Sequence, residues 1–262
     1  MRFDVCAHTY DEHAGPQRFF AERVAKFIRS GTGVSPVQWG SQEPGTSQIT
    51  DGPPGRRDAC PTTILELGAG TGALTRLLAE SEFGAPILAT DASPAMVQLG
   101  SLAVPQADWA VLDAFKQLLP VASLQVSSGL LHWAEDPVAM LERWKKSLSP
   151  GGHMTHAMPC DPCLAEWRAL VPESPVPWRS EAEWLNIFER AGLRVIRSQR
   201  WTHAAVCGSA LEMVRGFHRT GVTGRVRVGP ARLRQALRAY DAQHRVSGGV
   251  KATWAWLAVE AI

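Results

Sequence analysis

Apolar residues recur with two different spacings from residue 62 to the end of the chain. Short runs of β-branched and apolar residues, typical of buried strands, alternate with segments in which apolar residues recur every three or four positions, typical of helices. The expected strands are 62–67, 86–91, 108–112, 124–128, 153–158, 193–200 and 252–262. The expected helices are 71–79, 94–102, 137–148, 181–191, 210–219 and 230–244. This alternation predicts an α/β fold in which a mostly parallel sheet is covered by helices on both faces.

The chain before the first strand divides into a helix and a loop. Residues 8–29 have apolar residues at helical spacing, which predicts one amphipathic helix. In residues 31–61 this periodicity disappears, and 11 of the residues are glycine or proline. Such a composition predicts a flexible insertion.

Composition limits the class of protein without identifying it. The chain has 262 residues, of which 45% are hydrophobic and 20% are charged, values that are ordinary for a folded domain. It contains no apolar stretch of signal-peptide type and none that approaches the ~20 residues needed to span a bilayer. We therefore expect a single domain of residues 1–262 that is cytoplasmic and does not bind a membrane.

The five cysteines are odd in number and scattered, which indicates free thiols in a reducing compartment. Cys160 and Cys163 form one CxxC pair, but a structural zinc site needs four ligands and no second pair follows. A redox role stays open, although nothing around the pair resembles a thioredoxin. We expect no metal site.

Charge is unevenly distributed along the chain. The net charge is +2, yet residues 1–189 contain 14 Lys and Arg against 22 Asp and Glu, whereas residues 190–262 contain 13 against 3. The basic last third could attract an acidic partner, or it could be an ordinary solvated surface. Nucleic acid is a less favoured partner, because the whole chain is near neutral and has no base-binding motif of the Asn-Pro-Pro-Tyr kind.

A glycine-rich segment, ELGAGTGA, runs from Glu66 to Ala73 and joins an expected strand to an expected helix. Its glycines allow a tight turn and a close approach of the backbone to a ligand. Gly68, Gly70 and Ala73 also satisfy the dinucleotide pattern GxGxxG/A, which is weak evidence on its own. Glu66 argues against a pyrophosphate, because its carboxylate would repel that group. The carboxylate suits a cationic ligand instead, such as an ammonium near a sulfonium.

Two further carboxylates end the next two strands. Asp91 ends the second strand, where it can accept hydrogen bonds from both hydroxyls of a ribose. Asp113 ends the third strand, where it can accept from an adenine amino group. Together with Glu66 they line the carboxyl edge of the sheet, where open α/β sheets bind ligands. Taken alone, Asp91 could merely cap the helix that begins at Pro94.

These motifs resemble those of the class I S-adenosylmethionine-dependent methyltransferases, because ELGAGTG is followed by TDASPAM, LDAF and LSPGG. The resemblance implies a Rossmann-like sheet of seven strands with an antiparallel last strand, and a cofactor-binding core of residues 62–160. It implies S-adenosylmethionine as cofactor and S-adenosylhomocysteine as product. In that family the glycine loop holds the methionine part, Asp91 the ribose and Asp113 the adenine, on which Met96 packs. The implied cofactor-binding residues are Glu66, Gly68, Ala69, Gly70, Gly72, Asp91, Ala92, Met96, Asp113, Ala114 and Ser128.

Segments outside this core resemble the malonyl-[acyl-carrier protein] O-methyltransferases of biotin biosynthesis. They are 10–18, 128–133, 164–167, 211–223 and 248–254. Departures are the insertion 31–61, Gly129 where Asn is usual, and His132 where Gln is usual. The resemblance implies that the acceptor is the free carboxylate of a malonyl thioester on a carrier protein or coenzyme A. It also implies that residues 161–262 form the substrate side, with the basic third facing an acidic carrier protein.

A carboxylate is already ionised near neutral pH, since its pKa is about 4. Methyl transfer to it needs alignment and exclusion of water but no general base, so we assign no catalytic acid or base. The N-terminal helix 8–29 would form part of a lid, with Tyr10 over the cofactor. The expected substrate-binding residues are Tyr10, His13, Gln17, His132, Trp133 and Arg179.

Three other functions stay open on the sequence. One is a methyltransferase for another small molecule, such as a quinone precursor. A nicotinamide oxidoreductase is disfavoured by Glu66 and by the lack of a second catalytic domain. The third is a methyltransferase-like protein that binds the cofactor without turnover, which the intact glycine loop and acids do not exclude.

Overall fold

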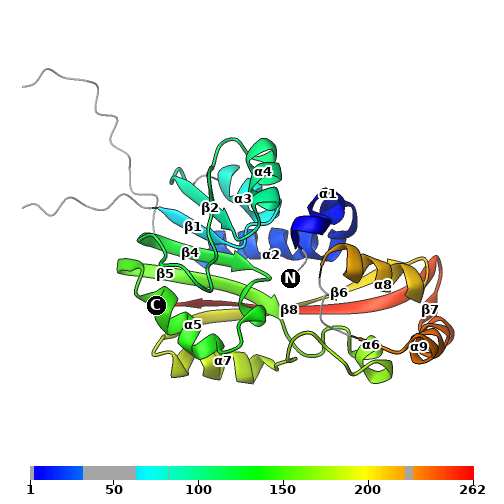
Figure 1. The fold of residues 1–262 in the computed structure, drawn as a ribbon. Coiled ribbons are helices and arrows are strands. Elements are labelled where there is room, and N and C mark those ends of the chain that lie inside the picture. Colours follow the sequence, from blue (N-terminus) through cyan, green and yellow to red (C-terminus); the bar gives the residue numbers. More distant parts are fainter. Residues whose placement is uncertain (1–2, 32–62, 82, 222–226) are drawn as a thin grey trace, which may run out of the picture.

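A computed structural model describes residues 3–31, 63–81, 83–221 and 227–262 of the chain. The predicted insertion 31–61 lies outside the described residues except for its first residue. The described strands are β1 (Ile64–Leu67), β2 (Ile87–Asp91), β3 (Asp108–Val111), β4 (Ala122–Ser128), β5 (Leu148–Pro159), β6 (Val195–Cys207), β7 (Arg245–Val246) and β8 (Gly249–Ala261). All of them belong to one sheet (Figure 1).

The sheet has the strand order β3-β2-β1-β4-β5-β8-β6, and the short β7 pairs with β8. The strands from β3 to β5 are parallel to one another, whereas β8 runs antiparallel to both β5 and β6. This arrangement confirms the predicted mostly parallel sheet with an antiparallel last strand. The carboxyl ends of β1, β2, β3 and β4 therefore meet at one edge, where the glycine loop and both strand-end aspartates lie.

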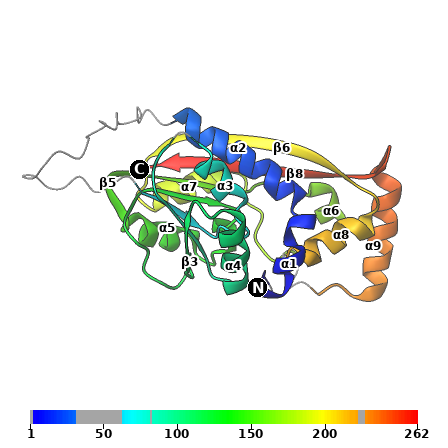
Figure 2. The same ribbon diagram turned by 90° about the horizontal axis from the view of Figure 1, so that it is seen from above.

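The helices are α1 (Phe3–His13), α2 (Gly15–Gly31), α3 (Ala73–Ala79), α4 (Pro94–Ala103), α5 (Pro137–Lys145), α6 (Ala165–Leu170), α7 (Glu181–Arg190), α8 (Ala210–Arg219) and α9 (Pro230–Gln243), with a 3₁₀ turn η1 at Leu131–Trp133. The prediction of a single helix over 8–29 is wrong, because the helix breaks at Ala14. Pro16 explains the break, since proline has no amide hydrogen to donate to the carbonyl of Glu12 and its ring would clash with that carbonyl in a continuous helix. The break lets α1 turn away from α2 (Figure 2).

Two apolar cores cover the two faces of the sheet. On one face α2 and α3 pack through Phe20, Val24 and Leu74. On the other face α5 and α7 pack through Trp144 and Trp184. Along β8, successive residues alternate between these cores, as the two-residue period of a strand requires. The central strands of the sheet are thus buried on both faces, whereas the edge strands β3 and β6 are partly exposed.

Strands β6 and β8 run far beyond the rest of the sheet. β8 pairs with β5 only as far as Trp256, whereas its pairing with β6 continues to Val250. The result is a two-stranded extension of the sheet, which we call the ribbon (residues 202–207 and 250–255). Helices α6, α8 and α9 gather around the ribbon, and α1 lies beside α8 (Figure 2). The ribbon and the helices around it are therefore an addition at the carboxyl edge, and they make up only part of the predicted substrate side 161–262, which also contains α7 and the remainder of β6 and β8.

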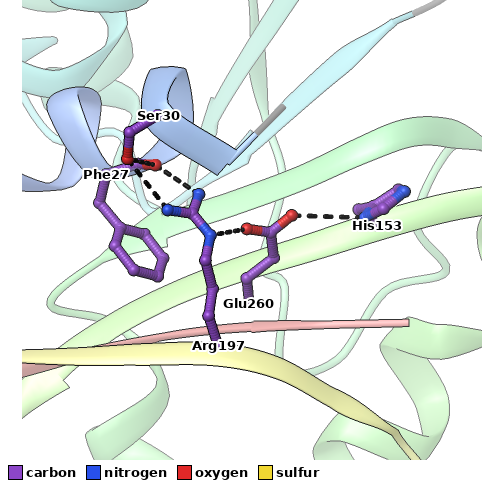
Figure 3. Close-up of polar contacts among 5 residues, drawn as sticks. All are labelled: Phe27, Ser30, His153, Arg197 and Glu260. Carbon is purple, nitrogen blue, oxygen red and sulfur yellow. Dashed lines mark hydrogen bonds and ion pairs between the residues drawn. The ribbon is translucent and has the colours of Figure 1, made fainter. Parts of the chain in front are cut away.

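A buried ion-pair cluster anchors the end of α2 to the sheet (Figure 3). Arg197 on β6 donates to a carboxylate oxygen of Glu260 on β8 at 2.5 Å and to the Ser30 hydroxyl at 3.0 Å. It also donates to the carbonyl of Phe27, and its guanidinium lies 3.8 Å from the centre of the Phe27 ring. The second oxygen of Glu260 lies 3.4 Å from Nδ1 of His153. These contacts fix α2, whose first turn faces the ligand-binding edge.

Candidate functional site

The glycine loop connects β1 to α3 at the carboxyl edge of the sheet. Gly68, Gly70 and Gly72 all have positive φ angles, which a side chain would strain. A Cβ atom at Gly70 would meet no other atom within 4 Å, so its backbone faces open space. Backbone bonds from Ala69 N to Thr90 O (2.8 Å) and from Gly72 N to Ala69 O (3.0 Å) hold the loop against β2. The loop is thus a fixed backbone surface that a ligand can approach closely.

Glu66 is buried beneath this loop, with 2% of its surface exposed. Its carboxylate accepts a 2.7 Å hydrogen bond from the Thr75 hydroxyl. The pKa of Glu66 is raised to about 7: burial raises it most, the Thr75 hydrogen bond opposes the rise, and the nearby charge of Asp91 adds to it. Within the described part of the chain, the partner of this carboxylate is the neutral hydroxyl of Thr75, and a buried carboxylate paired in this way favours a cation.

Asp91 holds the glycine loop and the start of α4 at once. One carboxylate oxygen accepts from the backbone nitrogen of Gly70 and the other from that of Ser93, both at 2.9 Å. Each oxygen of an ionised carboxylate can accept more than one hydrogen bond. The helix α4 is capped by Ser93, which accepts from Met96 N, so capping does not occupy Asp91.

The structure places the remaining predicted cofactor residues along the same edge. Asp113 accepts from Phe115 N at 3.0 Å and pairs with Lys116 at 3.0 Å. Met96 is buried in the first turn of α4, next to the exposed Ala92. The carbonyl of Ala114 accepts from the indole of Trp144 at 2.9 Å, which is a packing role.

A cleft of about 50 Å³ lies over the glycine loop. Of the predicted cofactor residues, it contacts Glu66, Gly68, Ala69, Gly70 and Ser128. It does not extend to Met96, Asp113 or Ala114, and residues of α1 and α2 line its other side.

Among the residues of this cleft that were not predicted as site residues are Asp11 and Thr71. The Thr71 hydroxyl donates a 2.6 Å hydrogen bond to the Asp11 carboxylate, which joins the glycine loop to α1. The two residues are 60 positions apart in the sequence, so spacing gives no signal of this contact. The one signal in the sequence was that Asp11 lies within the motif 10–18, which indicated that this segment belongs to the site.

A second and larger cavity, of about 450 Å³, opens beside the cleft. Tyr10, Gln17 and Ser128 line both, so the two spaces share one wall. The walls of the larger cavity are mostly apolar and aromatic, and they come from the ribbon, α6, α8 and the loop after β4. Its aromatic lining consists of Tyr10, Trp133, Trp167, Trp178, Phe217, Trp254 and Trp256.

Four of the six expected substrate residues line this cavity, namely Tyr10, Gln17, His132 and Trp133. His13 does not; its Nε2 lies 2.8 Å from Nη1 of Arg219 on α8. Arg179 does not line it either, because its guanidinium lies over the ring of Trp184 at 4.9 Å.

Two arginines do line the cavity, Arg215 on α8 and Arg168 on α6, and the sequence did not single out Arg168. Its guanidinium lies 4.9 Å from the Trp178 ring and pairs with Asp161. Helix α6 was not predicted, because it has only six residues and too few turns to show a period.

Burial shifts the pKa values of two ionisable side chains that line the larger cavity, Tyr10 and His132, in opposite directions. It raises the pKa of Tyr10 to about 12, helped by the charges of Asp91 and Asp11. It lowers the pKa of His132 to about 3, helped by the positive charge of Arg179. Near neutral pH both groups are therefore uncharged.

Several buried polar atoms in the cavity wall have no hydrogen-bond partner within the described part of the chain. They are Gln17 Oε1, His132 Nδ1, Arg168 Nε, Trp178 Nε1 and Trp256 Nε1. Buried polar groups are normally paired, so a polar ligand is the natural partner for such a set.

The CxxC pair lies in the apolar core. Cys160 and Cys163 are buried, and burial raises their thiol pKa values to about 11 and about 12. Such thiols are unreactive near neutral pH. Across residues 3–31, 63–81, 83–221 and 227–262, no three His, Cys, Asp or Glu side chains are arranged to hold a metal ion. No helix in the same ranges is long and apolar enough to cross a membrane.

Comparison with known sequences gives one family match and several relatives. Residues 65–154 match the family model described as "Methyltransferase domain". The chain is 30% identical over 259 residues to a biotin biosynthesis bifunctional protein BioCD of Bordetella avium, covering 92% of this chain and 48% of that protein. It is 36% identical over 161 residues (58% of this chain, 46% of the relative) to a malonyl-[acyl-carrier protein] O-methyltransferase of Hahella chejuensis. It is 32% identical over 118 residues (44% and 46%) to a trans-aconitate 2-methyltransferase of an Azoarcus species.

The chain thus spans about half the length of the curated relatives it matches. Among solved structures, a putative methyltransferase of Bacillus halodurans superposes with a TM-score of 0.59 at 12% identity, covering 76% of this chain and 91% of that one. At this identity the superposition establishes the fold and not the reaction.

Proposed function

We propose that this chain, which resembles the class I S-adenosylmethionine-dependent methyltransferases in sequence and in fold, methylates the free carboxylate of a malonyl thioester. The observation that carries the proposal is the absence of a suitable base from the buried end of the larger cavity, among the residues described. A general base works best when its pKa lies near the operating pH. The pKa of Tyr10 is about 12 and that of His132 is about 3, so neither meets this condition.

An acceptor in this cavity must therefore arrive as a nucleophile. A hydroxyl or an ammonium would need to lose a proton first, whereas a carboxylate is already ionised. Glu66, whose pKa is about 7, lines the cofactor cleft and not the larger cavity. Glu173 and His218 line the larger cavity, but both are exposed at its rim.

The residues around the glycine loop fit S-adenosylmethionine. When bound, this cofactor supplies a methyl group on a cationic sulfur. Glu66 would receive its ammonium, because the buried carboxylate has only the Thr75 hydroxyl as a partner. Asp91 would accept from the ribose with its remaining lone pairs, while Gly70 N keeps the carboxylate oriented. Asp113 would accept from the adenine amino group, beside Met96.

The chain's contribution to the reaction is alignment and exclusion of water. Tyr10, Gln17 and Ser128 stand between the cleft and the cavity, so the methyl group passes to the acceptor there. The apolar walls exclude water and so strip the carboxylate of its solvation. The unpartnered donors of Arg168, Trp178 and Trp256 can bind acceptor oxygens.

The charge of the cavity favours malonyl thioesters over trans-aconitate. Trans-aconitate carries three carboxylates, which several cations would have to neutralise. Of the described residues, only Arg168 and Arg215 bring an arginine or lysine to the wall, and Arg168 already pairs with Asp161. A malonyl thioester carries one free carboxylate, which matches the small number of positive charges in the cavity wall.

The carrier would approach over α8 and α9. Arg215, Arg227, Arg234 and Arg238 are exposed on or beside these helices. Acyl carrier proteins are generally acidic, so this face would raise their rate of encounter. A malonyl group on coenzyme A would place the same carboxylate in the cavity, but this basic face would not raise its rate of encounter in the way described for the carrier protein.

Purified chain should be incubated with S-adenosylmethionine and either malonyl-carrier protein, malonyl-coenzyme A or trans-aconitate, and methyl esters should be measured by mass spectrometry. We expect ester from both thioesters, faster with the carrier protein at low salt, and none from trans-aconitate. Restoring growth to a biotin auxotroph that lacks this step would support the same conclusion. Ester on trans-aconitate alone, or S-adenosylhomocysteine binding without any turnover, would overturn the proposal.

A further inference from the structure

Helix α1 reaches toward both sites through residues of its last turn, Tyr10, Asp11 and His13. Toward the cofactor cleft, Asp11 accepts a 2.6 Å hydrogen bond from Thr71 in the glycine loop. Toward the larger cavity, His13 lies 2.8 Å from Arg219 of α8. Between them, Tyr10 lines the cleft and the cavity at once. Helix α1 therefore contacts both the glycine loop, which would hold the cofactor, and α8, which forms part of the wall for the acceptor.

The contacts continue into the cofactor-binding residues. Thr71 follows Gly70, whose backbone nitrogen donates to the ribose-side carboxylate of Asp91. A shift of the loop on ligand binding would therefore move the Thr71 hydroxyl and, with it, Asp11. On the other side, α8 contributes Val214, Phe217 and His218 to the cavity lining. Contact with α1 fixes where these side chains stand.

We propose that Asp11 is a positioning residue that couples the two sites: by holding Thr71 it docks α1 on the cofactor-bound glycine loop, and the docked α1 sets α8 as the wall for the acceptor. This inference rests on the function proposed above. It gives the reaction an order, in which the cofactor binds first and completes the acceptor site. By linkage, the acceptor raises cofactor affinity by the same factor.

The coupling predicts a measurable ratio of affinities. Calorimetric titration of malonyl-coenzyme A should give a tighter dissociation constant with saturating S-adenosylhomocysteine than without it, by about 5-fold or more. In Asp11→Ala this ratio should approach one, and the acceptor KM should rise about tenfold with a smaller change in kcat. Asp11→Asn keeps an oxygen that accepts from Thr71 and should retain the ratio.

A second pair of variants tests the same bond from the loop side. Thr71→Val removes the donor at nearly constant shape, whereas Thr71→Ser keeps it, so only Thr71→Val should lose the coupling. Combined with Asp11→Ala, Thr71→Val should add little, because both remove one interaction. Glu22→Ala, which removes an exposed carboxylate from α2, should leave the ratio unchanged.

Hydrogen exchange makes the test independent of the acceptor. S-adenosylhomocysteine alone should slow amide exchange in α8, which lines no part of the cleft, and should not do so in Asp11→Ala. The inference would be overturned if Asp11→Ala and Thr71→Val both kept the affinity ratio and the protection of α8. It would also be overturned if S-adenosylhomocysteine did not change amide exchange in α8 of the native chain. Failure of the native chain to methylate any malonyl thioester would instead overturn the proposed function, and the exchange result would still decide this one.

Discussion

The backbone nitrogen of Gly70 donates a 2.9 Å hydrogen bond to a carboxylate oxygen of Asp91, so the glycine loop and the end of β2 hold each other in place. The contact makes Asp91 part of the loop's architecture as well as a candidate ligand for ribose. Loss of this carboxylate should therefore affect cofactor binding in two ways, through the missing acceptor and through a loosened loop.

We expect Asp91→Ala to weaken S-adenosylhomocysteine binding by at least about tenfold, since a hydrogen bond to a charged group contributes about 1.5–3 kcal/mol. Isothermal calorimetry measures this directly. Asp108→Ala is the matched control, because Asp108 is an exposed carboxylate at the opposite end of neighbouring β3. Unchanged affinity in Asp91→Ala would reject the ribose role.

Glu66 should make the ligand-free protein more stable in mild acid. Its pKa is about 7 in the folded chain and 4.5 as the ordinary value, so between these pH values the folded state keeps a proton that the unfolded state has lost. The stabilisation is complete below pH 4.5 and is lost as the pH rises through 7, amounting to at most about 3 kcal/mol. Urea unfolding from pH 5 to 8 should show this slope, and Glu66→Gln should flatten it.

The same carboxylate should release a proton when the cofactor binds. A bound ammonium favours the ionised form and lowers the pKa of Glu66, so binding near pH 6.5 expels part of a proton. Calorimetry in buffers of different ionisation enthalpy measures this release. Its persistence in Glu66→Gln would show that another group is responsible.

The turnover number should not titrate between about pH 6 and 9 when both substrates are saturating. Neither Tyr10 nor His132 changes its charge in this range, because their pKa values are about 12 and about 3. Tyr10→Phe and His132→Gln should keep the flat profile while raising the acceptor KM. A bell-shaped profile that either substitution abolishes would reveal a general base.

The cluster of Figure 3 should contribute strongly to stability. Arg197→Ala would leave the Glu260 side chain, 7% exposed, without its guanidinium partner. Breaking a fully buried pair costs about 3–5 kcal/mol, and the partial exposure of Arg197 reduces our expectation to about 2 kcal/mol. Arg200→Ala on the same strand is the control, because that side chain is about half exposed and lies 4.0 Å from Glu181. Equal urea midpoints for the two variants would contradict this assignment.

The sequence predicted the sheet well because its signals are local. Strand and helix periods alternate from residue 62. Asp91 ends one of the predicted parallel strands and Asp113 directly follows another, so their place at one edge of the sheet was predictable as well. The exact ends were less predictable. Strand β6 runs to Cys207, past the predicted end at residue 200, because its pairing with β8 continues beyond the other strands. Only the partner strand supplies that information.

The candidate site was likewise predictable only in the part that local motifs carry. Glu66, the glycines and Asp91 were predictable because one motif carries them. The wall of the larger cavity was not, because Arg168, Trp178 and Trp256 meet there from α6, the loop after it and β8. Arg179 and Arg168 are indistinguishable as residue types, and only packing decides that Arg179 lies over Trp184 while Arg168 enters the wall.

The ribbon and its helices can change in sequence independently of the strands that carry the glycine loop. The family match ends at residue 154, before the ribbon and its helices begin. Substitutions in α6, α8 or α9 can reshape the larger cavity, where we propose that the acceptor binds, without disturbing the strands that carry Glu66 and Asp91. A designer could therefore exchange this outlying module for one with another lining and keep the same methyl donor, so new acceptors are accessible without redesign of the sheet.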